Sequence, residues 1–126
     1  MKYPYMNIIR IAALTACLVL AGCSNAPDTA ATEFTEAAAA GRTAEALERL
    51  DPERRRMADM KLTSAVRRAA ADAERRGGLK DVRVVESEKS DGDHATVTVE
   101  LRFGDGTTKR DVHKVRKVDG EWFVTM

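Results

Sequence analysis

The sequence has no apolar run long enough to cross a membrane. Its longest run covers residues 11–22 of 126, whereas a bilayer core needs roughly 20 apolar residues in a helix. A basic stretch with Lys2 and Arg10 precedes the run, and small residues end it, which is the order found in a secretory signal peptide. We therefore expect residues 1–22 to be a signal that is removed on export from a lipid-anchored protein, with ordinary secretion without a lipid or an uncleaved anchor as the alternatives.

Cysteine is scarce. Of the 2 cysteines, Cys17 lies inside the apolar run and would leave with the signal, so Cys23 would be the one thiol that remains. A disulfide framework and a metal site made of cysteines are both excluded for the mature chain. The stability of the domain must come from packing.

An excess of charge of one sign is also lacking. The chain has 21 Lys and Arg against 20 Asp and Glu, and the signal carries away only Lys2 and Arg10. Nucleic-acid recognition normally requires a basic face, so we exclude nucleic acid as a partner. The residues that remain suffice for one small domain.

The most specific motif is Leu20-Ala21-Gly22-Cys23. It resembles the bacterial lipoprotein signal, which implies that diacylglycerol and further fatty chains such as palmitate are attached to Cys23. More than one chain holds a protein stably on a membrane. We expect residues 23–28 to be the lipidated cysteine and a flexible tether, and the domain to lie in the periplasm or outside the cell. Ser24 is not the aspartate that retains many lipoproteins on the inner membrane, so by analogy the outer membrane is favoured in a Gram-negative host.

The first half of the mature chain has helical periodicity. A first helix can begin near Asp28 or Thr29 and end at Gly41, and a second can begin at Thr43. Asp51 and Pro52 suit the start of a third helix, which we expect to continue to about residue 76. Its small apolar residues predict close approach to a sheet. They are Ala58, Leu62, Ala65, Val66, Ala69 and Ala73.

The second half alternates with a period of two, which is typical of strands. The clearest strand, residues 95–103, places its odd-numbered side chains on a buried face. Turn residues separate it from a strand around Val82, from a strand over 107–118 and from a last strand with Trp122. Mixed parity over 107–118 predicts a bulge near His113 or Lys114. We expect an α+β fold over residues 29–126, with N-terminal helices on one face of a four-stranded antiparallel meander.

Residues 91–99, 105–107 and 115–122 together resemble the bacterial domain of unknown function 4878. This family belongs to the nuclear transport factor 2-like superfamily, and the resemblance implies a cystatin-like arrangement of helices on a curved sheet. Members are commonly envelope lipoproteins without an assigned activity, so no catalytic residue carries over. The polar Arg116 and Lys117 depart from the apolar alternation that the family would lead one to expect.

The superfamily's cone-shaped fold often encloses a cavity that in its enzymes holds a histidine or a carboxylate. His113 would face such a cavity if it shares the side of Val115, and it could then pair with a carboxylate as a general base. The alternative is an edge or bulge histidine that faces solvent. Trp122 either lines the cavity or belongs to the core. His94 adjoins a turn and is expected at the surface.

Two further groups have competing interpretations. The run from Arg54 to Arg56 either contacts anionic headgroups or is a solvated face that neighbouring acids neutralise. Met57 and Met60 are expected to pack between helix and sheet, with a role in ligand binding as the alternative. No metal, cofactor or catalytic residue is predicted.

These observations lead to a functional hypothesis. We expect a non-enzymatic envelope lipoprotein that binds a partner protein or a small ligand beside the membrane. The alternative is a small hydrolase or isomerase that uses His113 in a cone-shaped pocket. A passive spacer in the envelope is the third alternative.

Overall fold

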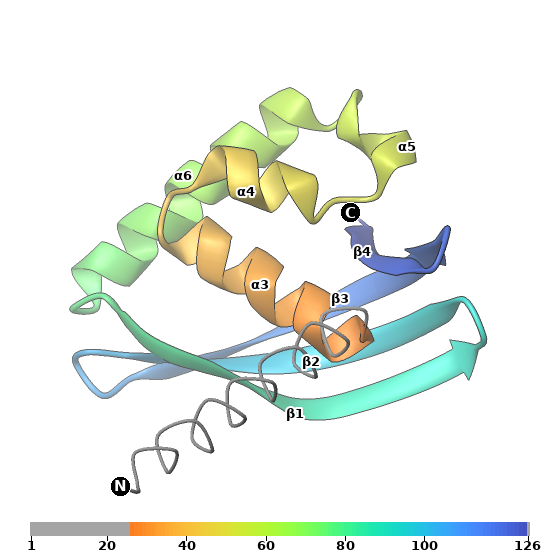
Figure 1. Cartoon of the computed structure of the whole chain (residues 1–126). Coiled ribbons are helices and arrows are strands. Elements are labelled where there is room, and N and C mark those ends of the chain that lie inside the picture. The colour runs from red at the N-terminus through yellow and green to blue at the C-terminus, as the bar shows by residue number, and fades with distance from the viewer. Residues whose placement is uncertain (1–25, 126) are drawn as a thin grey trace, which may run out of the picture.

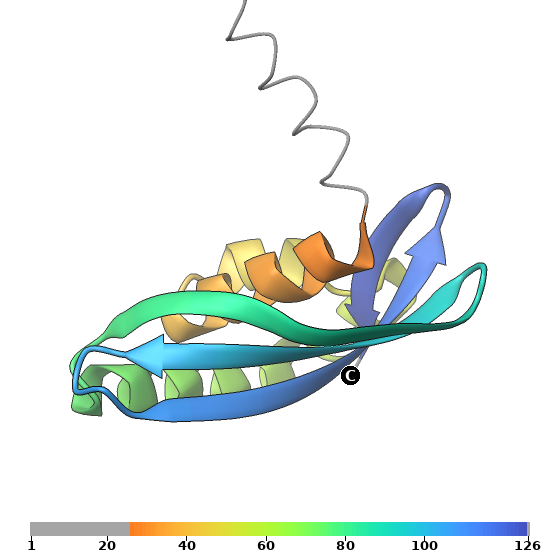
Figure 2. The ribbon, with the colours of Figure 1, turned by 90° about the horizontal axis from the view of Figure 1, so that it is seen from below.

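The computed structural model describes residues 26–125, which form a layer of helices on one face of a four-stranded antiparallel sheet (Figures 1 and 2). The strands follow one another in the order β1-β2-β3-β4, which confirms the predicted α+β meander. The elements are α3 (Pro27–Ala39), α4 (Thr43–Glu48), α5 (Pro52–Arg55), α6 (Asp59–Arg75), β1 (Leu79–Asp91), β2 (His94–Phe103), β3 (Thr108–Val118) and β4 (Glu121–Thr125).

The signal, the lipobox and Cys23 lie outside the described residues. Among residues 26–125, no helix has the length and apolarity that spanning a membrane requires. The first described helix, α3, begins at Pro27 rather than at Asp28 or Thr29, because proline occupies the first helical position without losing a hydrogen bond. Residues 27 and 28, expected in the tether, therefore belong to this helix.

The expected third helix is broken in two, which corrects the prediction of one helix from 52 to 76. Asp51 begins α5 as predicted, because its Oδ1 accepts the backbone N–H of Glu53 at 2.9 Å. The chain then turns before α6. Met57 and Met60 fall on the outside of this corner and are 87% and 86% exposed, so the expectation that they pack between helix and sheet is wrong.

The helical layer is attached to the sheet at two ends. At one end, residues 49–51 run beside β4: the N–H of Asp51 donates to the carbonyl of Val124 at 2.8 Å, and the N–H of Val124 donates to the carbonyl of Arg49 at 2.8 Å. The Asp51 carboxylate there is 2% exposed and pairs with Arg116, whose Nε lies 3.0 Å from Oδ2.

At the other end, α6 ends at Gly77 and Gly78, and the β2–β3 turn packs against that segment. The N–H of Gly104 donates to the carbonyl of Gly78, and the N–H of Asp105 donates to the carbonyl of Arg76, both at 2.8 Å. Gly77 and Gly78 have φ of 89° and 88°, a conformation that favours glycine.

The sheet supplies the floor of the core. All five odd-numbered side chains of β2 from Ala95 to Phe103 are buried, as predicted. The predicted bulge in β3 is wrong, because β3 pairs with both neighbours in unbroken register. The irregularities lie in β1 instead, which is an edge strand with one partner. The helices leave one face of the sheet uncovered, and we call it the open face. Val112 points to this open face and is largely exposed, so it does not share the side of the buried residues of β3.

Helix α6 packs mainly on α3 and α4 rather than on the sheet. The expectation that its alanines bring it close to the sheet is therefore wrong. Leu62 and Val66 are buried, while Ala65 and Ala69 are only half-buried. A space is left between α6 and the strands.

Candidate functional site

A cavity of about 630 Å³ lies between α3, α6 and the helix-covered face of β2, β3 and β4. We call it the His113 cavity. Its apolar lining is Phe34, Leu62, Val66, Leu101, Phe103 and Val124. Mostly apolar walls with a few polar groups are typical of small-molecule sites.

The polar lining comes mainly from β3. Residues 109, 111 and 113 share the strand face of the buried Val115, because side chains alternate along a strand. This row places Lys109, Asp111 and His113 where β2 has only apolar residues. The helical side adds Thr35 from α3 and Asp72 from α6.

The His113 ring is held by two residues of α3. Its Nε2 lies 3.1 Å from Oγ1 of Thr35. Its ring centroid lies 5.5 Å from that of Phe34, in an edge-to-face arrangement with an interplanar angle of 75°. The structure thus places the histidine on the helix-covered face, with its ring against α3.

The hydrogen bonds of Thr35 assign the protonation of the neutral ring. Thr35 is 4% exposed, and its hydroxyl donates to the carbonyl of Ala31 at 2.8 Å. Since that hydroxyl has one proton, its oxygen accepts from His113, and Nε2 carries the ring proton. Nδ1 is then left as an unprotonated acceptor.

Burial lowers the pKa of His113 below its ordinary value, because the cavity wall desolvates the charged ring, and the negative charge of Asp111 opposes this only in part. No carboxylate among the described residues makes a hydrogen bond to the ring; its partner is Thr35. His113 is therefore neutral at neutral pH.

Trp122 does not join His113 in this cavity. It is buried in the core and is not among the lining residues. The Nζ atoms of Lys89 and Lys117 each lie 5.9 Å from its ring centroid. Trp122 is therefore a core residue whose ring is also contacted by the cations of two lysines.

His94 lies at the β1–β2 turn, as expected. Its Nδ1 is 3.0 Å from Oδ1 of Asp91, and both side chains are exposed. The pKa of Asp91 is lowered, first by the backbone N–H of Asp93 and then by His94. This pair stabilises a turn and faces no cavity.

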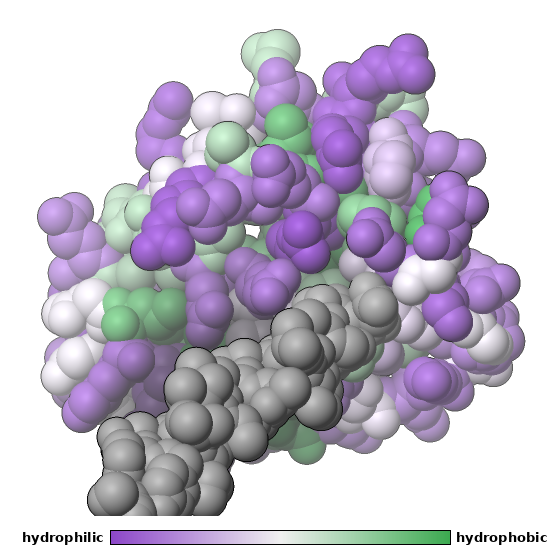
Figure 3. Space-filling model, in the orientation of Figure 1, coloured by the Kyte–Doolittle hydropathy of each residue, from purple (hydrophilic) through white to green (hydrophobic). Residues whose placement is uncertain are grey.

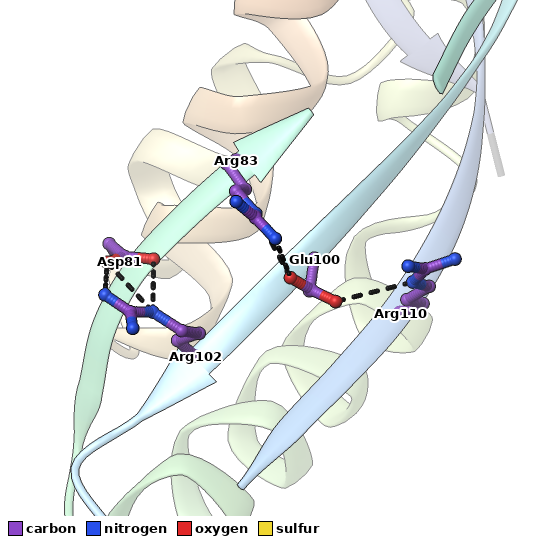
Figure 4. Close-up of polar contacts among 5 residues, drawn as sticks. All are labelled: Asp81, Arg83, Glu100, Arg102 and Arg110. Atoms are coloured by element: carbon purple, nitrogen blue, oxygen red, sulfur yellow. Dashed lines mark hydrogen bonds and ion pairs between the residues drawn. The ribbon is translucent and has the colours of Figure 1, made fainter. Parts of the chain in front are cut away.

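The open face carries a self-paired set of charges (Figure 4). Glu100 lies between Arg83 at 2.9 Å and Arg110 at 3.5 Å, and Arg102 pairs with Asp81 at 2.7 Å. Hydrogen bonds from the arginines lower the pKa values of Glu100 and Asp81. Both carboxylates are thus paired, and the three arginines leave this set with one excess positive charge.

The other surfaces of the described residues have fewer features of a binding site. A broader groove of about 1130 Å³ between α3, α4, α6 and β1 is lined by small and charged residues. The molecular face of Figure 3 is mostly hydrophilic, with scattered hydrophobic patches. Within residues 26–125, no three His, Cys, Asp or Glu side chains are grouped so that they could hold a metal ion.

Sequence reasoning singled out His113 but missed Thr35, Lys109 and Asp111. The signal for Lys109 and Asp111 was their parity with His113 and Val115. Thr35 is distant in sequence and sits within an alanine-rich helix, so no local pattern connects it with His113.

One crystal structure among the known proteins supports the architecture. A candidate NTF2-like transpeptidase from Campylobacter jejuni, solved by crystallography, is 26% identical and has a TM-score of 0.72, with 80% of this chain and 98% of that chain covered. A SEC-C motif containing protein from Rhodopseudomonas palustris is 26% identical over 71% of this chain and 67% of that chain, with a TM-score of 0.47. No curated protein gives a significant match.

The family model of a domain of unknown function, DUF4878, matches residues 21–125. That range includes every described helix and strand. The chain therefore belongs to the DUF4878 family.

Proposed function

We propose that this protein is a lipid-anchored envelope protein that binds a small, largely apolar ligand in the His113 cavity without transforming it. The observation that carries the proposal is the cavity itself: apolar walls from both layers surround a few polar groups. The polar groups at the β1–β2 turn and on the open face, by contrast, already pair with one another.

The anchor follows from Leu20-Ala21-Gly22-Cys23. Cys23 stands a few residues before α3, so fatty chains on its thiol would keep the domain beside the bilayer. Mass spectrometry of the protein from a bacterial membrane fraction should find an amino-terminal Cys23 with acyl chains. An intact upstream signal, or an unmodified sulfur, would contradict the anchor.

A small ligand fits the structure better than a partner protein. The open face is occupied by its own ion pairs, and residues 49–51 already cover β4. A protein partner remains the alternative, and it would use a surface rather than the cavity.

The test is a cavity-filling substitution with a matched control. Ala69 lines the cavity, whereas Ala71, on the same helix, is exposed and does not. We expect n-decanol to shift the methyl NMR signals of Leu62, Val66 and Leu101 in the mature lipoprotein in lipid nanodiscs. Ala69→Leu should weaken this binding at least tenfold, which is about 1.4 kcal/mol, while Ala71→Leu should leave it unchanged. Equal binding by the two variants would refute the cavity as the site.

A second candidate function is an enzyme with His113 as general base, which the unprotonated Nδ1 favours. A transpeptidase like the one named for the Campylobacter jejuni protein would also need a nucleophile. The cavity offers no serine or cysteine among its lining residues, and the Thr35 hydroxyl donates to Ala31 rather than to His113. Turnover of a bound ligand that His113→Phe abolishes would establish the enzyme and overturn simple binding.

A further inference from the structure

The fixed ring of His113 gives the cavity one directional polar group. Nε2–H donates to Thr35, whose own proton is used on Ala31. Nδ1 makes no hydrogen bond to the described residues and is not among their buried, unsatisfied side-chain atoms. It is therefore an accessible acceptor in a ring that lines the cavity.

We propose that the His113 cavity selects an apolar molecule that presents one neutral hydrogen-bond donor, a hydroxyl or an amide N–H, to Nδ1 of His113. This inference rests on the proposed function, because it names the ligand class for the same cavity. The walls fix the apolar body, and Nδ1 is the acceptor that the fixed ring of His113 presents to a donor.

The charges around the ring argue against an ionic ligand. Lys109, Asp111 and Lys114 of β3 and Asp72 of α6 line the cavity, and α3 contributes no charge to it. Asp72 already pairs with Arg75 and Arg76, and Asp111 offsets one of the two lysines, so the lining has an excess of at most one positive charge. A carboxylate would also meet the lone pair of a neutral Nδ1, and protonating the ring to remove this repulsion is opposed by burial.

The first test needs no ligand. NMR of the ring nitrogens in the mature lipoprotein should show the proton of His113 on Nε2 at about pH 8. Thr35→Val, which has the same shape without the hydroxyl, should increase the Nδ1–H form. A ring that already carries its proton on Nδ1 in the wild type would overturn the proposal.

The second test compares n-decanol with its isomer methyl nonyl ether, which has no donor, and with decanoate. The wild type should bind the alcohol about fivefold more tightly than the ether, which corresponds to about 1 kcal/mol for one net hydrogen bond. Decanoate should bind more weakly than the alcohol at about pH 8 and should gain as the pH falls and the ring or the ligand takes up a proton. The readout is a titration of the cavity methyl signals.

Two substitutions separate the acceptor from the donor. In His113→Asn the amide oxygen can replace Nδ1, so the preference for the alcohol should persist. In His113→Gln the amide nitrogen can replace Nε2 towards Thr35, and the acceptor at Nδ1 is lost. The alcohol and the ether should then bind alike.

The outcomes distinguish the two proposals. If the alcohol and the ether bind equally to the wild type while Ala69→Leu blocks both, the cavity binds ligands and the donor selection is wrong. If no probe shifts the cavity signals, the proposed function fails and this inference fails with it. If decanoate binds most tightly at about pH 8, the cavity selects an anion, and the proposal of a ligand with a neutral donor is overturned.

Discussion

Thr35 determines the chemistry of the cavity although it contributes only one hydroxyl. By donating to Ala31 and accepting from Nε2, it holds the ring of His113 in one orientation and one tautomer. A histidine on a strand would otherwise have two neutral forms. The hydrogen-bonding property of the cavity therefore depends on two residues together, Thr35 of α3 and His113 of β3.

The pH dependence of stability should report the burial of His113. Burial lowers its folded pKa below the ordinary value of 6.5, so the unfolded chain takes up the proton first. The contribution of this group is complete above the unfolded pKa and is lost as the pH falls through the folded pKa. Chemical denaturation should show wild-type stability decreasing from about pH 7.5 to about pH 5 by more than in His113→Gln.

The comparison with His113→Gln is necessary because other groups act in the same direction. The pKa values of Asp81 and Glu100 are also lowered, by Arg102 and Arg83 first, and their stabilisation is likewise lost towards acid. These carboxylates are unchanged in the variant, so they cancel in the difference. Parallel curves for the two proteins would show that His113 titrates normally.

At the scale of elements, the corner between α5 and α6 explains the two exposed methionines. Replacing both, as Met57→Ser with Met60→Ser, should change the free energy of unfolding by less than about 0.5 kcal/mol, because neither side chain is buried. Leu62→Ala, in the same helix, should cost about 2–5 kcal/mol, since Leu62 is 0% exposed. Urea denaturation of the three proteins measures both values. A large loss in the methionine variant would show that the corner is packed in solution.

The elements that could be predicted are those whose local pattern agrees with their tertiary surroundings. Alternation over 95–103 sufficed for β2, because one face of that strand is buried along its whole length. It failed for β3, where Val112 faces outward and Lys109, Asp111 and His113 face inward beside a cavity. The alternation of β3 is regular in space and irregular only in polarity.

The break between α5 and α6 was not predictable from periodicity. After Pro52 at the start, residues 53–76 contain no proline or glycine, so helix signals alone favour one helix. The turn accompanies the pairing of residues 49–51 with β4, which is a contact between distant parts of the chain. For the site, the sequence indicated His113 and its face, whereas its partner Thr35 depended on how α3 crosses the sheet.

At the scale of the whole molecule, the close approach of Gly77 and Gly104 joins the two layers. A Cβ on Gly104 would collide with the backbone carbonyl of Gly77, whereas a Cβ on Gly92 would meet nothing within 4 Å. We expect Gly104→Ala to cost about 1–3 kcal/mol through this overlap and Gly92→Ala to change stability by less than about 0.5 kcal/mol. Thermal denaturation of both variants tests this, and equal melting temperatures would show that the junction can relax.

The two attachments between the helical layer and the sheet, at Gly78 with Gly104 and at Asp51 with Val124, also restrict access to the interior. Because the helical layer is hydrogen-bonded to the sheet at both ends, it cannot open by a hinge motion away from the sheet. If the proposed ligand binds, we expect it to enter beside β3, where Lys109 and Lys114 are exposed and line the cavity. These two lysines would then flank the entrance of the His113 cavity. Substituting them should change the rates of ligand association and dissociation and leave the affinity unchanged.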